Sequence, residues 1–94
     1  MKIKVFGKKG CAKCETTKNK FDHFFKKNNC HEMANLEFHD MDTVDGMAEG
    51  AYYDALKIPT SVIEKEDKIL ARWDGEVPKT EEFKAYFEEV LEKV

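Results

Sequence analysis

Two cysteines three residues apart, Cys11 and Cys14, most constrain what this chain can fold into. They follow a stretch of alternating polar and apolar residues, 2–6, which is typical of a β-strand. They also open a segment in which apolar residues recur every three to four positions, as expected of a helix. Cysteines with this spacing in a first helical turn lie on one face, with Cβ atoms about 5–6 Å apart. That separation is close to the one that a disulfide requires.

The position of the two cysteines at the start of a helix also favours thiol chemistry. A helix N-terminus presents unpaired N–H groups and a partial positive charge, and both stabilise a thiolate relative to a thiol. We expect Cys11, at the cap, to be the exposed attacking sulfur and Cys14, one turn further on, to be the shielded resolving sulfur. The motif therefore predicts a small thiol–disulfide oxidoreductase, in which Cys11 forms a mixed disulfide and Cys14 resolves it.

The rest of the pattern predicts the element order β-α-β-α-β-β-α in one domain spanning the whole chain. Residues 12–28 have helical periodicity, and residues 36–41 are expected to form a second strand. Two further apolar runs, 61–64 and 68–73, flank a short turn and indicate a hairpin. A strand–helix–strand unit requires a right-handed crossover and a parallel pair. We therefore expect an α/β fold with a four-stranded mixed sheet and helices on both faces.

Each predicted helix is expected to bury one apolar face. For the first helix this face consists of Cys14, Thr17, Phe21, Phe24 and Phe25. The second helix is expected to begin at a cap formed by Asp42 or Thr43. Its inner face is expected to consist of Val44, Met47, Ala48, Ala51 and Ala55. The last helix, capped by Thr80, is expected to bury Phe83, Phe87, Val90, Leu91 and Val94.

Charge is distributed unevenly along the chain. Residues 1–20 hold seven lysines and one glutamate, although the whole chain has a formal net charge of −3. Lys8, Lys9 and Lys13 are candidates for lowering the pKa of Cys11 and for contacting acidic partners, and they also fit an ordinary solvated surface. The basic segment lacks interleaved aromatic residues that would stack on bases, so we expect no nucleic-acid binding.

Hydropathy predicts a protein with no membrane contact. No apolar run approaches the ~20 residues of a membrane-spanning helix. Residues 1–4 begin no apolar segment of the signal-peptide type, so we expect a cytoplasmic location. Thiols are kept reduced there, and a C-x-x-C motif is more often catalytic or metal-binding than a structural crosslink. We also expect a monomer.

A metal site is the main alternative use of the cysteines. Together with Cys30 and His31, they would supply enough ligands for a tetrahedral zinc ion. Cys30 lies beyond the far end of the first predicted helix, roughly 24 Å from Cys14 at the helical rise per residue. Convergence on one ion would require that this helix not form, and its phenylalanine face favours helix formation.

Three segments resemble the glutaredoxin branch of the thioredoxin superfamily, in the family's order. They are FGKKGCAKC at 6–14, KIPT at 57–60 and WDGEVP at 73–78, the last similar to the Trp-Ser-Gly-x-x-Pro segment of NrdH-redoxins. The resemblance implies a thioredoxin fold over essentially the whole chain and no resident cofactor. It also implies a cis peptide bond before Pro59, with the Ile58 backbone turned toward Cys11 to pair with an extended substrate segment.

The chain departs from typical dithiol glutaredoxins in two places. Ala12-Lys13 stands where they carry Pro-Tyr, and a single Gly75 stands where they carry the Gly-Gly and Asp that hold glutathione. We therefore expect a dithiol carrier that reduces protein disulfides and is recharged by a flavoprotein of the thioredoxin-reductase type. A glutathione-dependent glutaredoxin is the second hypothesis. A metal-binding or redox-sensing module that uses the same cysteines is the third.

Overall fold

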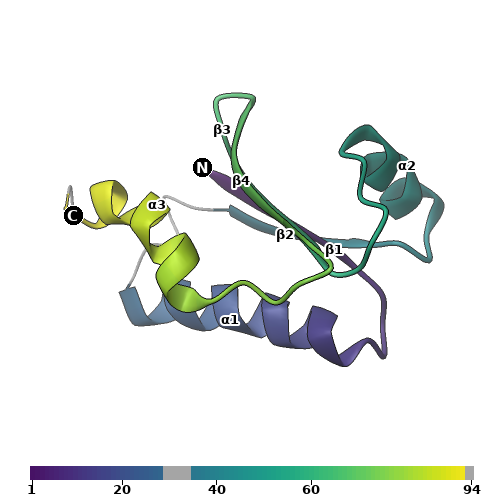
Figure 1. Cartoon of the computed structure of the whole chain (residues 1–94), viewed down its shortest axis with the longest axis horizontal. Coiled ribbons are helices and arrows are strands. Elements are labelled where there is room, and N and C mark those ends of the chain that lie inside the picture. The colour runs from purple at the N-terminus through teal and green to yellow at the C-terminus, as the bar shows by residue number, and fades with distance from the viewer. Residues whose placement is uncertain (29–34, 93–94) are drawn as a thin grey trace.

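The computed structural model of the chain describes residues 1–28 and 35–92, and its elements follow the predicted order (Figure 1). The elements are β1 (Lys2–Gly7), α1 (Ala12–Asn28), β2 (Asn35–Asp40), α2 (Val44–Tyr52), β3 (Thr60–Lys65), β4 (Lys68–Asp74) and α3 (Thr80–Glu92). The helix predicted over 12–28 has these bounds, and no predicted strand differs from the observed one by more than one residue at each end. The prediction that Thr80 caps the last helix was wrong by one residue. α3 begins at Thr80 itself, because the Lys79 carbonyl accepts the N–H groups of Glu82 and Phe83.

The strands form one mixed sheet in the order β2-β1-β3-β4. β1 and β2 are parallel, whereas β3 is antiparallel to both β1 and β4. α1 and α3 cover one face of the sheet and α2 covers the other (Figure 1). The predicted α/β fold, with helices on both faces of a four-stranded mixed sheet, is confirmed. Because β1 and β2 are parallel, their carboxyl ends meet at one edge of the sheet, and the cysteine loop begins there.

A cluster of phenylalanines fills the space between the sheet and the layer formed by α1 and α3. Its buried members are Ile3, Val5, Phe21, Phe24, Phe25, Ile63, Phe83 and Phe87. The ring centroids of Phe21 and Phe83 lie 4.6 Å apart, and Phe24 meets Phe83 edge-to-face at 5.3 Å. These aromatic contacts join α1 to α3, and aromatic pairs of this kind contribute about 0.5–1.5 kcal/mol beyond the area that they bury.

The predicted inner face of α1 is confirmed, since its buried residues are Cys14, Thr17, Phe21, Phe24 and Phe25. On α3, Phe83 and Phe87 are fully buried as expected. The three other residues assigned to that face, Val90, Leu91 and Val94, lie outside the part of the chain whose side chains are described.

The prediction for the inner face of α2 was wrong. The residues that the helix buries are Gly46 and Gly50, while Val44, Met47, Ala48 and Ala51 are exposed. Among the predicted residues, Ala55 alone is buried, and it follows the helix.

The reason lies in how closely α2 approaches the end of β2. A Cβ on Gly46 would overlap the Asp40 carbonyl, and a Cβ on Gly50 would overlap the end of the Met41 side chain. Thr43 caps the helix as predicted, and its hydroxyl oxygen accepts the Gly46 N–H at 2.9 Å. The backbone of α2 therefore packs through its glycines, and its apolar side chains point away from the sheet.

Candidate active site

Cys11 and Cys14 lie between the carboxyl end of β1 and the first turn of α1. The chain turns through Gly10, whose φ of 81° is in the left-handed region that favours glycine. The Cys11 carbonyl accepts the first bond of the helix, from the Glu15 N–H at 3.1 Å, so Cys11 is the N-cap residue. Its sulfur also accepts the Cys14 N–H at 3.2 Å, as a capping side chain does.

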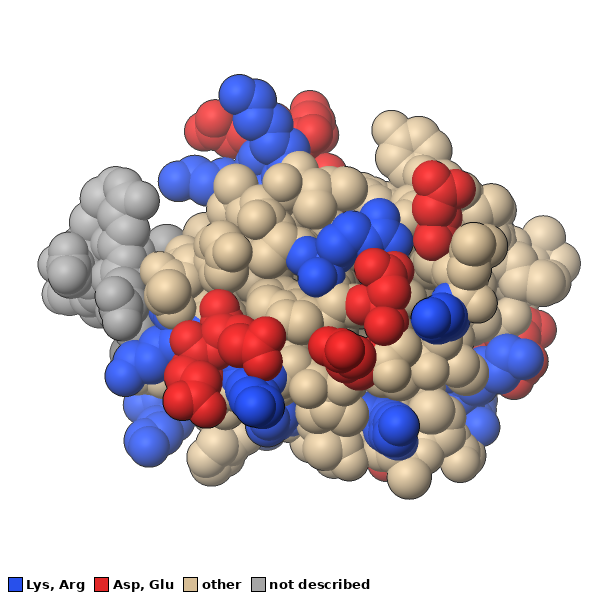
Figure 2. All heavy atoms as spheres, in the orientation of Figure 1, with Lys and Arg blue, Asp and Glu red and all other residues tan. Residues whose placement is uncertain are grey.

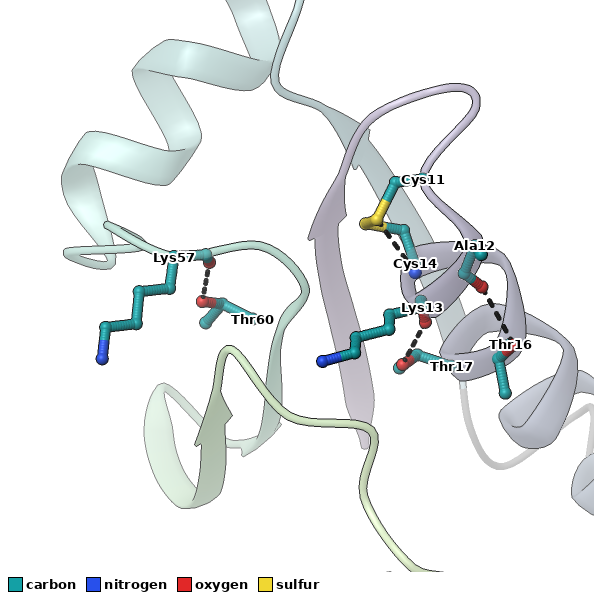
Figure 3. The surroundings of a disulfide bond; sticks show 8 residues. All are labelled: Cys11, Ala12, Lys13, Cys14, Thr16, Thr17, Lys57 and Thr60. Carbon is teal, nitrogen blue, oxygen red and sulfur yellow. Dashed lines mark hydrogen bonds between the residues drawn. A yellow bond between two sulfur atoms is a disulfide. The ribbon is translucent and has the colours of Figure 1, made fainter.

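The two cysteines are joined by a disulfide, with Cα atoms 5.2 Å apart (Figure 3). Cys14 is fully buried, whereas Cys11 is half-buried. Cys11 is therefore the sulfur that a second molecule reaches more easily. The greater exposure of Cys11 agrees with its expected role as the attacking sulfur, and the burial of Cys14 agrees with its role as the resolving sulfur. Both roles stay predictions.

Gly7 makes room for the buried sulfur. A Cβ at this position would lie 2.8 Å from both the Cβ and the Sγ of Cys14, and 3.2 Å from the Phe38 ring. Cys14 therefore packs directly against the last residue of β1. The predicted strand ended at residue 6, before Gly7, and the sequence analysis missed this role, although a glycine at a strand end is a signal of close approach.

Residues 57–60 lie across from the disulfide (Figure 3). The peptide bond between Ile58 and Pro59 is cis, as the resemblance implied. Thr60 is opposite Phe6 in the β1–β3 register, so the buried Pro59 lies beside the end of β1 that Cys14 contacts. Ile58 is half-buried at this place, and its pairing with a substrate segment stays a prediction.

The segment after β4 packs against residues 57–60. The Gly75 N–H donates to the Pro59 carbonyl at 2.8 Å, and Gly75 has a left-handed φ of 73°. The aliphatic chain of Lys57 lies over Gly75, where a Cβ would come within 3.2 Å of it. Trp73 donates its indole N–H to Glu82 at 2.9 Å, which ties β4 to α3. The tertiary structure thus brings all three segments of the resemblance to one end of the sheet.

The carboxylate of Asp74, beside this bend, carries a testable pH dependence. Arg72 donates to it from two nitrogens, at 2.8 and 3.0 Å. This hydrogen bonding, with a smaller contribution from the charge of Lys57, holds the pKa of Asp74 below its ordinary value. Because the folded-state pKa is depressed, the carboxylate stabilises the fold above its unfolded-state pKa. The contribution is lost as the pH falls through the folded-state pKa.

We expect Asp74→Asn to lower the free energy of unfolding at pH 7 by less than about 1 kcal/mol, since solvent screens this exposed pair. The difference from the wild type should shrink as the pH falls below about 4. Urea unfolding at neutral and acidic pH measures both quantities. Glu76→Gln, which removes an exposed carboxylate two residues further on, is the control. A deficit that stays the same at acidic pH would contradict the assignment.

The candidate lysines have different surroundings. Lys8 forms an ion pair with Asp42, with Nζ 3.4 Å from the carboxylate oxygen. Lys13 is exposed in the first turn of α1, and Figure 3 shows its side chain extended from that helix. Asp42 partly neutralises the charge of Lys8, whereas Lys13 is exposed to solvent. Their effect on the Cys11 pKa stays a prediction.

Two of the four candidate ligands of the alternative metal site, Cys30 and His31, lie outside the described residues. Within residues 1–28 and 35–92, no group of three or more His, Cys, Asp or Glu side chains is arranged to hold a metal ion. The same part of the chain contains no helix that is both long and apolar enough to cross a membrane.

Comparison with known proteins identifies the family. The family model for the thioredoxin domain matches residues 1–88, which is most of the chain. The chain belongs to the thioredoxin-domain family. Membership of the thioredoxin superfamily, expected from three short segments, is thereby confirmed, and the glutaredoxin-like or NrdH-redoxin-like subtype stays a prediction. No curated protein matches the chain.

Solved structures show the same thioredoxin fold. Thioredoxin 1 from the thermophilic eubacterium Thermosipho africanus superposes with a TM-score of 0.74 at 20% identity, covering 99% of this chain and 97% of that chain. A malarial protein superposes with a TM-score of 0.76 at 19% identity, covering 94% of this chain and 93% of that chain. Fasciola hepatica thioredoxin superposes with a TM-score of 0.70 at 19% identity, covering 89% of this chain and 75% of that chain. At these identities the likeness concerns the fold. The thioredoxin domain and its Cys11–Cys14 disulfide together support a thiol–disulfide oxidoreductase.

Proposed function

We propose that this thioredoxin-domain protein is a dithiol electron carrier that reduces disulfides in other proteins. The observation that carries the proposal is the bonded pair of Cys11 and Cys14, one sulfur accessible and the other buried, at the N-terminus of α1. The disulfide is the oxidised form of such a carrier, and the dithiol is the form that donates electrons.

The reaction has two exchange steps. The Cys11 thiolate attacks a substrate disulfide, forms a mixed disulfide and releases one substrate thiolate, which takes up a proton. The Cys14 thiolate then attacks the Cys11 sulfur, releases the second substrate thiol and closes the Cys11–Cys14 disulfide. Two electrons pass from the dithiol to the substrate, and a reductant must return them before the next cycle.

The N-terminus of α1 supports the role of Cys11 as nucleophile. The N–H of Cys14 points at the Cys11 sulfur, and a thiolate would accept the same hydrogen bond. A helix terminus stabilises a nearby negative charge by up to ~2 kcal/mol in favourable geometry. That amount lowers a thiol pKa by little more than one unit. Lys8 and Lys13, three residues before and two residues after Cys11 in the chain, are the cations that would lower it further.

We infer that a flavoprotein of the thioredoxin-reductase type recharges the disulfide in preference to glutathione. Two observations support this inference: the match to the thioredoxin-domain model, and the single Gly75 where glutaredoxins hold glutathione with Gly-Gly and Asp. As part of the same proposal, the carrier is a cytoplasmic monomer whose substrates are disulfides of other proteins.

A redox titration of the cysteine pair tests this function without a choice of reductase. We expect a single two-electron transition in dithiothreitol buffers, with a midpoint potential near that of thioredoxin, about −270 mV. Alkylation and mass spectrometry of each mixture measure the fraction of Cys11–Cys14 disulfide. A midpoint near about −200 mV, in the glutaredoxin range, would favour glutathione as the donor. Failure of the pair to oxidise would leave the metal-binding hypothesis in its place.

A further inference from the structure

The outer face of α2 carries an exposed apolar stripe. Val44, Met47 and Tyr52 are 78%, 49% and 82% exposed, and Leu56, just after the helix, is 91% exposed. With Ala48 and Ala51, the helical members recur at intervals of three to four residues, so they lie on one face. We call these six residues the α2 stripe.

This stripe is not a core face that happens to be uncovered. α2 packs on the sheet through Gly46 and Gly50, on its opposite side, and a Cβ on Gly46 would overlap the Asp40 carbonyl there. The exposed side chains therefore contribute little to the stability of the isolated fold. Contiguous apolar patches on the surface of a small protein commonly mark sites of interaction.

The border of the α2 stripe is acidic. Residues 40–56 contain five aspartates and glutamates and no lysine, arginine or histidine. Two of the five pair with lysines from elsewhere in the chain, Asp42 with Lys8 and Glu49 with Lys4, and the other three are Asp40, Asp45 and Asp54. In Figure 2 the surface over α2, at the upper right, is mostly uncharged and interrupted by acidic side chains. Asp45 and Glu49 line a shallow pocket of about 400 Å³ together with Ala48 and Tyr52 of the stripe.

A second pocket, of about 330 Å³, lies at the C-terminal end of α2 against the β3–β4 hairpin. Its lining residues are Tyr52, Tyr53, Asp54, Glu64, Asp67, Ile69 and Arg72. The Tyr53 hydroxyl donates to the Glu64 carboxylate at 2.6 Å, and Arg72 is paired with Asp74. Lys4 already lies over the Tyr53 ring, with Nζ 4.7 Å from its centroid, so Tyr52 is the ring open to a further cation. Three carboxylates beside the exposed Tyr52 ring make a site that suits an ammonium or guanidinium group. We call it the acidic pocket.

We propose that the α2 stripe and the acidic pocket form a docking surface for a partner protein segment that carries apolar side chains next to a lysine or arginine. The basic side chain enters the acidic pocket beside Tyr52, and the apolar side chains cover the stripe. Charge complementarity selects this occupant. A symmetric contact between two copies of the chain would bring two acidic borders together. The proposal goes beyond the redox function, and its test requires no thiol chemistry.

Fluorescence anisotropy of a labelled synthetic amphipathic helix, with leucines on one face and lysines beside them, tests the surface. The wild type should bind it at least about tenfold more tightly than the same helix with glutamates in place of the lysines. Tyr52→Ala should weaken binding by about tenfold or more, since exposed tyrosines at the centre of an interface contribute strongly. Tyr86→Ala, on α3 and 38% exposed, is the matched control and should leave binding unchanged.

A second variant isolates the charge. Asp54 and Asp67 have left-handed φ values of 54° and 65°, which asparagine tolerates, so Asp54→Asn/Asp67→Asn should keep the turns. This double variant should bind the lysine helix at least about fivefold more weakly, with a smaller salt dependence.

Three results would overturn the proposal. One is no binding by the wild type up to about 1 mM of the lysine helix. Another is equal loss of binding in Tyr52→Ala and Tyr86→Ala. The third is concentration-dependent self-association in sedimentation equilibrium that Tyr52→Ala abolishes, which would make a second copy the occupant.

Discussion

Cys11→Ser is expected to reduce the rate of insulin disulfide reduction to the uncatalysed background. Serine keeps the size and the N-cap geometry of the side chain, but its hydroxyl is not ionised at neutral pH and cannot form a mixed disulfide. The expectation rests on the position of Cys11, whose half-buried sulfur accepts the Cys14 N–H at the start of α1. The turbidity of reduced insulin, in the presence of excess dithiothreitol, measures the rate.

Cys14→Ser is expected to stop the reaction one step later. Cys11 can still attack a substrate disulfide in this variant, but no buried thiol is present to resolve the product. A mixed disulfide between the protein and its substrate should therefore accumulate, visible as a higher-mass species on non-reducing gels and removed by reductant. Cys14 is fully buried against Gly7, so a thiol from solution cannot occupy its place and resolve the mixed disulfide in the same way.

Cys30→Ser is the matched control for both variants, because it replaces the third cysteine of the chain. It should retain the wild-type rate if the chemistry uses Cys11 and Cys14 alone. Turnover by Cys11→Ser at the wild-type rate would refute the dithiol mechanism. Loss of activity in Cys30→Ser, together with stoichiometric zinc in the purified wild type, would favour the metal-binding hypothesis.

Gly46→Ala is expected to destabilise the fold by about 2–3 kcal/mol or more, in the range of strained or overpacked substitutions. Helix propensity alone predicts the opposite, because a glycine-to-alanine change inside a helix usually stabilises the protein by about 1 kcal/mol. The added Cβ would overlap the Asp40 carbonyl and lie 2.9 Å from the Thr43 hydroxyl that caps the helix. Since a backbone carbonyl cannot rotate away, α2 would have to shift from the end of β2.

Gly50→Ala is the informative comparison. Its Cβ would overlap only the end of the Met41 side chain, which is flexible and can adopt another rotamer. The gain in helix propensity should offset the repacking, so stability should change by less than about 1 kcal/mol. Urea unfolding of the two variants and the wild type measures both differences. A neutral or stabilising effect of Gly46→Ala would show that α2 does not approach β2 this closely.

The sequence by itself determined the parts of this protein that depend on neighbouring residues. The period of the apolar positions placed all seven elements and the buried face of α1, because a helix or strand repeats its own faces regardless of what covers them. The spacing of Cys11 and Cys14 predicted both their disulfide and their place at a helix start. The cis bond before Pro59 was accessible only through resemblance, since most such bonds are trans.

Only the tertiary structure decided which side of α2 faces the sheet. Apolar periodicity identifies a face, but it assumes that side chains fill the contact, and here the approach of two backbones excludes them. The same holds for Gly7, which admits the sulfur of Cys14, and for Lys8, whose ion pair with Asp42 joins two loops. These contacts join residues of different elements or loops, at distances set by the packing of whole elements. No periodicity within one segment contains that information.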